Sequence, residues 1–188
     1  MVGEEKNMKY LIATDIHGSL YYGQKIIDAF NLLQADKIIL LGDTLYHGPR
    51  NDLPKEYNPK ELTNLLNQYK NKIISVKGNC DSDVDQMVLQ FPIIAPLIIM
   101  EIKNRNIYFT HGDIFNSNHL PPMNKNDILV HGHTHVVRKE VHPDHIYLNP
   151  GSISLPKENC YHGYMLLDED CFYYYDENHQ IKDVYKID

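Results

Sequence analysis

Three histidines at alternate positions, His131, His133 and His135, stand in the sequence LVHGHTH. If this segment is a strand end that leads into a turn, alternate side chains point in the same direction. A single histidine is ordinarily a hydrogen-bonded core or surface residue. Three within five residues favour a shared target, and a metal ion is the simplest one. The rest of the chain must then supply further ligands.

Other metal-capable side chains follow short apolar runs that end at glycine or a turn residue. The runs are typical of buried strands and occupy residues 9–18, 36–43, 71–81, 106–113 and 127–135. The candidate ligands at their carboxyl ends are Asp15, His17, Asp43, Asn79, His111, His133 and His135. Taken singly, the Asp and Asn residues are equally typical of turns and helix caps. As an ordered set they predict one common site, because open α/β sheets bind ligands beyond the carboxyl ends of their strands.

This donor set consists of two carboxylates, one amide oxygen and four imidazoles. It lacks the thiolates of structural zinc and iron–sulfur sites, and it is too rich in imidazole for magnesium or calcium. Manganese, iron and zinc fit it best. Seven donors exceed what one catalytic ion accepts while keeping an open position. The set therefore favours two ions that share a carboxylate, roughly 3.5–4 Å apart, which can stabilise in-line displacement at phosphorus.

The elements that must position these donors can be predicted from the hydrophobic pattern. Residues 19–34 and 59–71 each place apolar side chains on one helical face. Strands that alternate with these helices predict right-handed crossovers and a parallel sheet. The second half contains the short segments HIYLNPGS, HGYMLLDED, CFYYYDENHQ and IKDVYKID, which we interpret as a meander. We expect two sheets packed face to face, with helices outside.

Length and composition favour one globular domain. We assign it to residues 8–188 and regard residues 1–7 as a dispensable tail. The net charge of −7 argues against a general nucleic-acid surface. No apolar run is long enough to span a membrane, and the start of the chain has no signal-peptide core. Cys80, Cys160 and Cys171 have no paired spacing, which favours reduced thiols and a cytoplasmic location.

The motifs D-x-H, G-D, G-N-x-[HCD], H-G-D and G-H-T-H occur in this order between residue 8 and about residue 155. As a set they resemble the calcineurin-like metallophosphoesterase superfamily. The forms GNCD, GDTLYHGPRN and NPGS are similar to those of its small bacterial and archaeal phosphodiesterases. The retromer subunit of the vacuolar sorting machinery shares this small fold.

The resemblance implies a four-layer αββα sandwich and a role for each donor. Asp15, His17 and His135 would bind the first ion, whereas Asn79, His111 and His133 would bind the second. Asp43 would bridge both ions, and a hydroxide between them would attack phosphorus in line. Manganese is the commonest activating ion among the small members of the superfamily, with nickel, cobalt, iron and zinc as alternatives.

One position departs from the pattern of larger relatives, which have histidine where this chain has Cys80. A free thiol, with a pKa of about 8.5, is a weak proton donor unless the field of a metal lowers that pKa. We therefore hypothesise that activated aryl diesters are cleaved better than alkyl diesters; alternatively, Cys80 packs as a small apolar residue.

Arg50 either clamps a phosphate oxygen or is a solvated loop residue. Asp81 is expected in a turn or beside a histidine ligand, and NPGS is expected to support the histidine loop.

The preferred function is a binuclear phosphodiesterase that hydrolyses a small phosphodiester or nucleotide-like substrate. A phosphomonoesterase is a close variant. A retromer-like interaction scaffold with a non-catalytic metal site is the alternative from a different class, and a metal-binding regulator without turnover is a third. Small relatives often form homodimers or homotetramers, and we expect one of these states.

Overall fold

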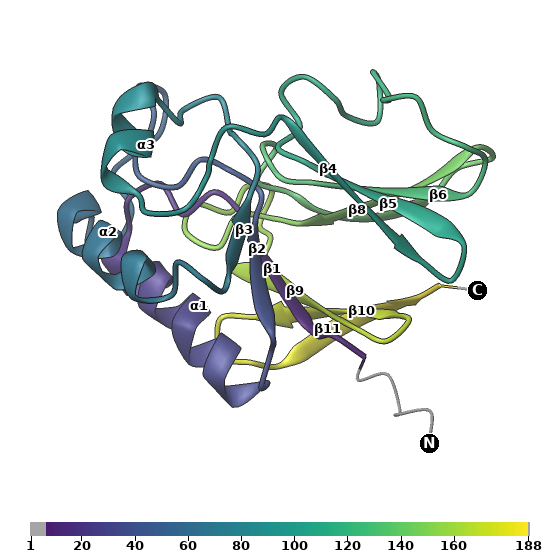
Figure 1. The fold of residues 1–188 in the computed structure, drawn as a ribbon, viewed down its shortest axis with the longest axis horizontal. Coiled ribbons are helices and arrows are strands. Elements are labelled where there is room, and N and C mark those ends of the chain that lie inside the picture. Colours follow the sequence, from purple (N-terminus) through teal and green to yellow (C-terminus); the bar gives the residue numbers. More distant parts are fainter. Residues whose placement is uncertain (1–6, 188) are drawn as a thin grey trace.

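The computed structural model describes residues 7–187, in which two β-sheets lie face to face (Figure 1). The first has six strands. In spatial order they are β11 (Ile181–Lys186), β10 (Cys171–Asp176), β9 (Gly163–Asp168), β1 (Tyr10–Ala13), β2 (Lys37–Leu40) and β3 (Ile73–Ser75). Strands β1, β2 and β3 are parallel, as predicted, and β9 to β11 form an antiparallel meander on the other side of β1.

Two helices connect the parallel strands and cover the outer face of this sheet. Helix α1 (Leu20–Leu32) begins where the Ser19 hydroxyl accepts a hydrogen bond from the Tyr22 N–H, and Asn58 caps α2 (Pro59–Gln68) in the same way. Both helices are shorter than predicted. After α1, Gln34 takes the left-handed conformation at φ 52°, which ends the helix.

The second sheet has five strands and contains most of the differences from the prediction. In spatial order they are β4 (Leu97–Ile102), β5 (Arg105–Thr110), β6 (Asp127–His131), β8 (His145–Pro150) and β7 (Val137–Val141). The segment HIYLNPGS was wrongly predicted to join the meander. It forms β8, which enters the second sheet between β6 and β7.

Strands β4 and β7 and helix α3 (Asp83–Val88) were not predicted. The two strands lie at the edges of the second sheet and are only half covered; β7, with the sequence VRKEV, is mostly charged, and β4, with the sequence LIIMEI, is apolar without alternation. Helix α3 has six residues, none of them buried, and depends on a capping box between Ser82 and Asp85. Elements of this kind lack the hydrophobic period on which the prediction relied.

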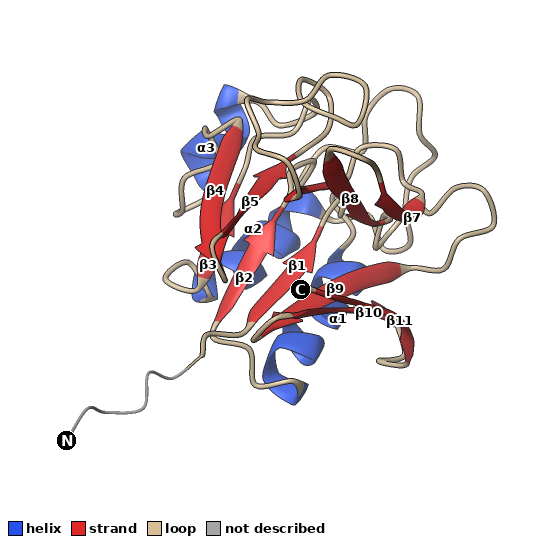
Figure 2. Cartoon of the chain, turned by 90° about the vertical axis from the view of Figure 1, so that its right-hand side faces the viewer, coloured by secondary structure: helices blue, strands red, loops and turns tan. Residues whose placement is uncertain are grey.

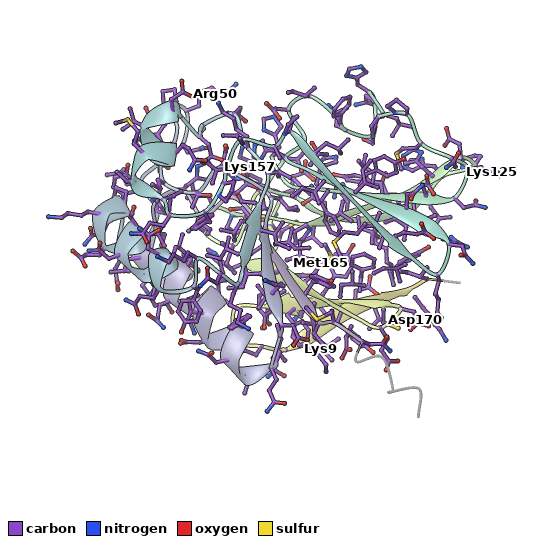
Figure 3. The ribbon with its side chains drawn as sticks, viewed as in Figure 1. Lys9, Arg50, Lys125, Lys157, Met165 and Asp170 are labelled. Atoms are coloured by element: carbon purple, nitrogen blue, oxygen red, sulfur yellow. The ribbon has the colours of Figure 1, made fainter. Side chains whose placement is uncertain are left out.

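The predicted sandwich of two mixed sheets is confirmed, and one apolar core fills the space between them. Met165 of β9 lies in this core, fully buried (Figure 3). A second core lies between the first sheet and its helices. On the second sheet the outer layer is a loop, residues 112–126, where a helix was expected. The Tyr108 hydroxyl donates to the Pro122 carbonyl of this loop at 2.9 Å.

The carboxyl ends of β1 and β2 point to one rim of the molecule, where the longer loops gather (Figure 2). No helix within residues 7–187 has the length and apolar character needed to cross a bilayer. The expected tail lies outside the described residues, apart from Asn7. The rim is therefore the place where the predicted donors should meet.

We predict that Leu62→Ala lowers the free energy of unfolding by about 2–5 kcal/mol, because Leu62 is fully buried between α2 and the first sheet and its loss leaves a cavity. Leu32→Ala is the matched control, because this leucine of α1 is 61% exposed and its replacement should change stability by less than about 0.5 kcal/mol. Urea unfolding followed by circular dichroism measures both. Similar losses in the two variants would contradict the assignment of this core.

Candidate metal centre

The seven predicted donors come together at the rim, although they are spread over more than a hundred residues of sequence. They come from the turns after four strands and from the histidine loop after β6: Asp15, His17, Asp43, Asn79, His111, His133 and His135. Their donor atoms fall into two groups.

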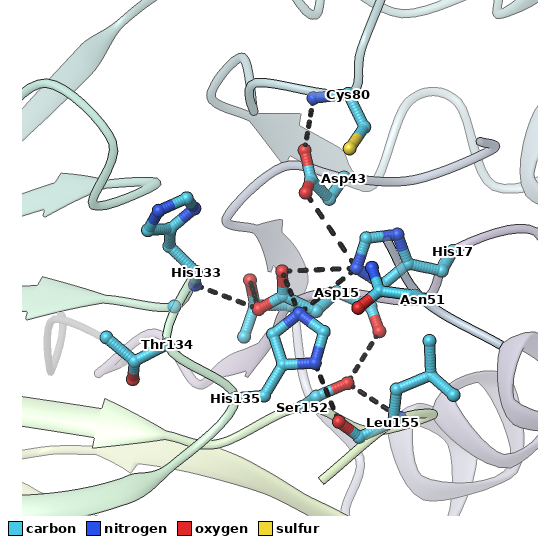
Figure 4. Close-up of polar contacts among 12 residues, drawn as sticks. Asp15, His17, Asp43, Asn51, Cys80, His133, Thr134, His135, Ser152 and Leu155 are labelled. Atoms are coloured by element: carbon cyan, nitrogen blue, oxygen red, sulfur yellow. Dashed lines mark hydrogen bonds and ion pairs between the residues drawn. The ribbon is translucent and has the colours of Figure 1, made fainter. Parts of the chain in front are cut away.

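The first group joins Asp15, His17 and His135 (Figure 4). The two Nε2 atoms of the histidines lie 3.2 Å apart. Asp15 Oδ1 is 3.3 Å from the His135 Nε2 and 3.6 Å from the His17 Nε2. All three side chains are almost completely buried. One ion at the centre of this triangle would be in reach of all three donors.

The second group surrounds the Nε2 atom of His111. Asn79 Oδ1 and His133 Nδ1 both lie 3.1 Å from it. Asp43 Oδ2 lies 3.4 Å from the same nitrogen. This Asp43 oxygen is also 3.8 Å from the His17 Nε2 of the first group. A single carboxylate oxygen therefore lies between the two groups, as the resemblance predicted for a bridging ligand.

The hydrogen bonds of the imidazoles show which nitrogen faces the centre. The Nδ1–H groups of His17, His111 and His135 donate to backbone carbonyls at 2.8, 2.8 and 2.6 Å. In the neutral ring, each Nε2 then carries a lone pair directed at its neighbours. Asp15 Oδ1 is buried and accepts no hydrogen bond within residues 7–187. Converging lone pairs around a buried carboxylate repel one another unless a cation lies between them, so this donor set fits a divalent metal.

The directions in which the pKa values of these residues are shifted also indicate that the site favours positive charge. Burial opposes ionisation, yet the His135 and His17 rings hold the pKa of Asp15 well below its usual value. For Asp43, the His111 ring likewise outweighs burial and lowers the pKa. In return, the carboxylates overcome the effect of burial on the histidines: they raise the pKa of His17, and they raise that of His111 to about 9. Positive charge is thus favoured at the positions that metal ions would take.

Backbone strain is concentrated at the same residues. Five of the seven donors have left-handed backbone conformations, with φ from 52° to 65°: Asp15, His17, Asp43, His133 and His135. Such conformations cost about 1–3 kcal/mol each in residues other than glycine and persist only where the surroundings hold them. They turn the chain sharply at the strand ends, which aims the side chains inward.

Asp81 holds the turn that carries Asp43. Its carboxylate accepts from the N–H groups of Asp43, Thr44 and Gly78 at 2.8–2.9 Å. Gly78 is required here, because a Cβ at this position would overlap Asp43. Of the two roles expected for Asp81, the structure therefore supports the one in a turn and not the one beside a histidine ligand, since its hydrogen bonds go to backbone amides.

A serine pair holds Asp15, and the sequence pattern did not identify it. The hydroxyls of Ser152 and Ser154 both donate to the Asp15 carbonyl, at 2.9 and 2.7 Å. Asn149 donates to the Gly132 carbonyl at 3.0 Å, so the NPGS segment supports the histidine loop as predicted. The signal in the sequence was the run NPGSIS directly after a buried strand, but the partner of each hydroxyl depends on the fold.

His131 stands apart from the two histidines that follow it. Its ring is buried, stacks on Tyr147 with centroids 4.5 Å apart, and donates through Nδ1 to the Gly132 carbonyl. Burial lowers its pKa to about 4. The left-handed turns at His133 and His135 separate these two rings from His131, so only they join the cluster. His131 therefore has a buried, hydrogen-bonded role and is not one of the metal donors.

A cleft of about 800 Å³ opens onto the cluster. Arg50 lines it from the exposed loop after Asp43 (Figure 3), and Lys157, which was not predicted, lines it too. The Lys157 N–H donates to the His135 carbonyl at 2.9 Å. Cys80 also lines the cleft, and its N–H donates to Asp43 Oδ1 at 2.8 Å. Burial and the Asp43 carboxylate raise the pKa of its thiol to about 12.

Comparison with known proteins agrees with this geometry. The calcineurin-like phosphoesterase superfamily domain matches residues 8–171. The phosphodiesterase YfcE of Escherichia coli K12 is 44% identical over 163 residues, which are 87% of this chain and 89% of the relative. The solved structure of YfcE, described as a phosphoesterase, has a TM-score of 0.92 at 40% identity and covers 96% of this chain and 100% of its own. The zinc complex of Vps29 from Entamoeba histolytica has a TM-score of 0.61 at 20% identity, covering 96% and 100%, and shares the fold.

Metal binding should stabilise the folded protein. We predict that Mn²⁺ at a hundred times its dissociation constant contributes about 2.7 kcal/mol, which raises the Tm of the chelator-treated protein by roughly 5–10 °C. Asp43→Asn should lose at least about half of this rise, because its carboxylate lies between both donor groups. Asp52→Asn, an exposed loop change, is the control and should keep the whole rise. Differential scanning calorimetry measures it, and an equal rise in Asp43→Asn would contradict the shared role of Asp43.

Proposed function

The chain belongs to the calcineurin-like phosphoesterase superfamily, and we propose that it is a metal-dependent phosphodiesterase that hydrolyses small or nucleotide-like phosphodiesters. We propose two divalent ions, with Mn²⁺ as the usual one and Ni²⁺, Co²⁺, Fe or Zn²⁺ as substitutes. Asp15, His17 and His135 would hold one ion, Asn79, His111 and His133 the other, and Asp43 both. The observation that carries this proposal is the Asp43 oxygen at 3.4 and 3.8 Å from histidines of the two donor groups.

The bound ions would supply Lewis-acid activation of the phosphoryl group and of the attacking water. The protein's own contribution is to hold the donors rigid. Asp43 Oδ1 accepts a hydrogen bond from the Cys80 N–H, whereas Asp43 Oδ2 faces the two donor groups. Asn79 directs its amide oxygen toward the same centre, while its Nδ2 contacts the Cys80 sulfur at 3.3 Å. Fixed donors lower the cost of reorganisation when charge develops on the phosphoryl oxygens.

Arg50 is proposed to bind a phosphoryl oxygen of the substrate. Its guanidinium is exposed at the mouth of the cleft and makes no ion pair or hydrogen bond with other residues of the described chain. Its backbone is held by the turn in which the Asn51 side chain donates to the His47 carbonyl at 2.8 Å. A guanidinium can contact two oxygens of a phosphate at once, which favours this role.

The alternative function is an interaction scaffold with a non-catalytic metal site. That function predicts a damaged donor set, because nothing would maintain strained ligand conformations without chemistry. In this chain all seven donors converge, and five of them hold a left-handed backbone. These observations favour catalysis. A phosphomonoesterase remains a second candidate, since the same centre can activate water against either ester.

Two further proposals concern the setting of the enzyme. We propose a cytoplasmic location, because Cys80, Cys160 and Cys171 are all free thiols. The expected homodimer or homotetramer stays a prediction. A small phosphoester is the proposed ligand, and the net charge of −7 favours a small molecule over a nucleic-acid polymer.

Hydrolysis of a chromogenic aryl diester and the matching monoester tests the function. With Mn²⁺ the wild type should cleave the diester faster than the monoester, and without metal both rates should be negligible. Asp43→Asn should lower kcat/KM for the diester at least about a hundredfold, which corresponds to about 2.7 kcal/mol in the barrier. Asp52→Asn should behave as the wild type. Equal, negligible rates under every condition would favour the scaffold, and faster cleavage of the monoester would favour the phosphomonoesterase.

Replacement of Cys80 tests the proposed preference for activated esters. A thiol is a weak hydrogen-bond donor, so alkyl leaving groups should gain little help from it. Cys80→His should raise the rate on a methyl diester at least about tenfold and change the rate on an aryl diester far less, because only the poor leaving group needs a proton. Cys80→Ala is the comparator, and steady-state kinetics on both diesters provide the measurement. No gain with any diester would indicate that Cys80 only packs.

A further inference from the structure

A second cavity of about 540 Å³ lies beside the metal cleft. It is open to solvent and is bordered by helices α2 and α3 and by the loop that follows Asp43, all on the left in Figure 1. Leu45, Tyr46 and Tyr57 line it from the loop, and Val88 lines it from α3. Tyr46 lines both this cavity and the cleft, so the two spaces are neighbours across one aromatic ring.

The backbone of Tyr46 is fixed to the metal centre. Its carbonyl accepts the Nδ1–H of His17 at 2.8 Å, so this carbonyl and one donor of the first group are tied together. Tyr46 is 42% exposed as a residue, and its ring meets the His47 ring edge to face, with centroids 4.9 Å apart. A partly exposed ring on a fixed backbone can serve as a stacking platform.

The other aromatic wall is equally close to the centre. Tyr57 packs over Gly18, next to His17, so closely that a Cβ on Gly18 would overlap its ring. Gly18 also has φ of 80°, which favours glycine. Tyr57 meets the other side of His47 edge to face at 5.2 Å. Three rings in sequence thus connect the wall of the cavity with the wall of the cleft.

The threonine and asparagine side chains of the cavity are already paired within the protein. Thr63 donates to the Pro59 carbonyl, and Asn64 donates to Glu61. Asn67 donates to the Val88 carbonyl and accepts from the Gln90 N–H. Lys60, which is exposed, also lines the cavity, and its ammonium group makes no ion pair or hydrogen bond within residues 7–187. An occupant therefore gains mainly from apolar and aromatic contact, with Lys60 available to an acceptor atom at its edge. A flat aromatic group that carries such an acceptor can stack on tyrosine.

We propose that this cavity binds an aromatic arm of the diester substrate, an aryl group or a nucleobase, with Tyr46 as the residue that determines this preference. The inference rests on the proposed phosphodiesterase function and names a substrate class for it. The phosphoryl group lies at the metal centre, and the aromatic arm crosses Tyr46 into the cavity. A diester with two small aliphatic arms leaves the cavity empty.

Non-hydrolysable phosphonates separate binding from catalysis. Isothermal titration of the Mn²⁺-loaded wild type should show phenylphosphonate binding about tenfold or more tightly than methylphosphonate, the gain expected from one stacked ring. Tyr46→Ala should reduce this ratio to nearly one, and Tyr46→Phe should retain it. Leu53→Ala is the matched control, because this leucine of the same loop is 62% exposed and lies outside the cavity lining.

Two checks keep the result interpretable. The Mn²⁺-induced rise in Tm should persist in Tyr46→Ala, since only the backbone carbonyl of Tyr46 contacts His17. Val88→Asn alters the far wall without touching any donor, and it should lower the phenyl-to-methyl ratio at least about threefold by adding a polar group to an apolar wall. A nucleoside 5′-phosphonate that binds more tightly than phenylphosphonate would assign the arm to a nucleobase, and weaker binding would assign it to a simple aryl group.

The outcomes distinguish the two proposals. Equal affinity for the two phosphonates in the wild type, or a ratio unchanged in both Tyr46→Ala and Val88→Asn, would overturn this inference and leave the phosphodiesterase proposal standing. Failure of every phosphonate to bind while the aryl diester is still hydrolysed would overturn this inference alone. Failure of the Mn²⁺-loaded protein to hydrolyse the aryl diester would overturn the proposed function, and this inference with it.

Discussion

The architecture of the rim depends on one electrostatic constraint, which is the burial of two ionised carboxylates close together. Asp15 is fully buried and Asp43 nearly so, and an oxygen of each lies within 4.8 Å of the other and of His111. Burying a charge in this way costs several kcal/mol of desolvation unless positive charge compensates it. The surrounding imidazoles direct lone pairs at the same point, which makes the demand for a cation stronger. The carboxylates raise the pKa of His17 and His111, so protons and metal ions compete for the same ring nitrogens.

The rest of the rim can be understood as the means of holding that arrangement. The donors are brought inward by left-handed turns, and each such turn costs free energy that neighbouring contacts must offset. At Asp43 this cost is offset by the Asp81 carboxylate, which accepts hydrogen bonds from three backbone N–H groups. At Asp15 it is offset by the hydroxyls of Ser152 and Ser154, which both donate to the Asp15 carbonyl. The serine contacts join segments that follow strands of the two different sheets, β8 and β1. The two sheets must therefore be packed in register before the centre can form.

The sequence predicted the donors better than the supports, for a physical reason. A metal donor must have a particular side-chain chemistry and must follow a strand, so its type and position are both visible in the sequence. Asp81 and Ser154 need only reach a backbone group, and that group is fixed by tertiary contacts that no local pattern encodes. The same reasoning applies to the elements. The buried strands and the amphipathic helices were predicted, whereas the edge strands β4 and β7 and the exposed helix α3 were not. HIYLNPGS was assigned to the wrong sheet, because an apolar run shows that a strand is buried but does not show which strand it pairs with.

Function in this fold is decided by small features placed on a common scaffold. Chains at about 20% identity share the arrangement of sheets, so the sheets alone do not specify an activity. What specifies it here is the complete donor set together with the loop that follows Asp43. That loop holds His17 through the Tyr46 carbonyl and presents the Tyr46 ring to a neighbouring cavity. Because the backbone of Tyr46 contacts the metal donor and its side chain lines the cavity, the ring can change without moving His17. Substrate preference can therefore change while metal binding is retained.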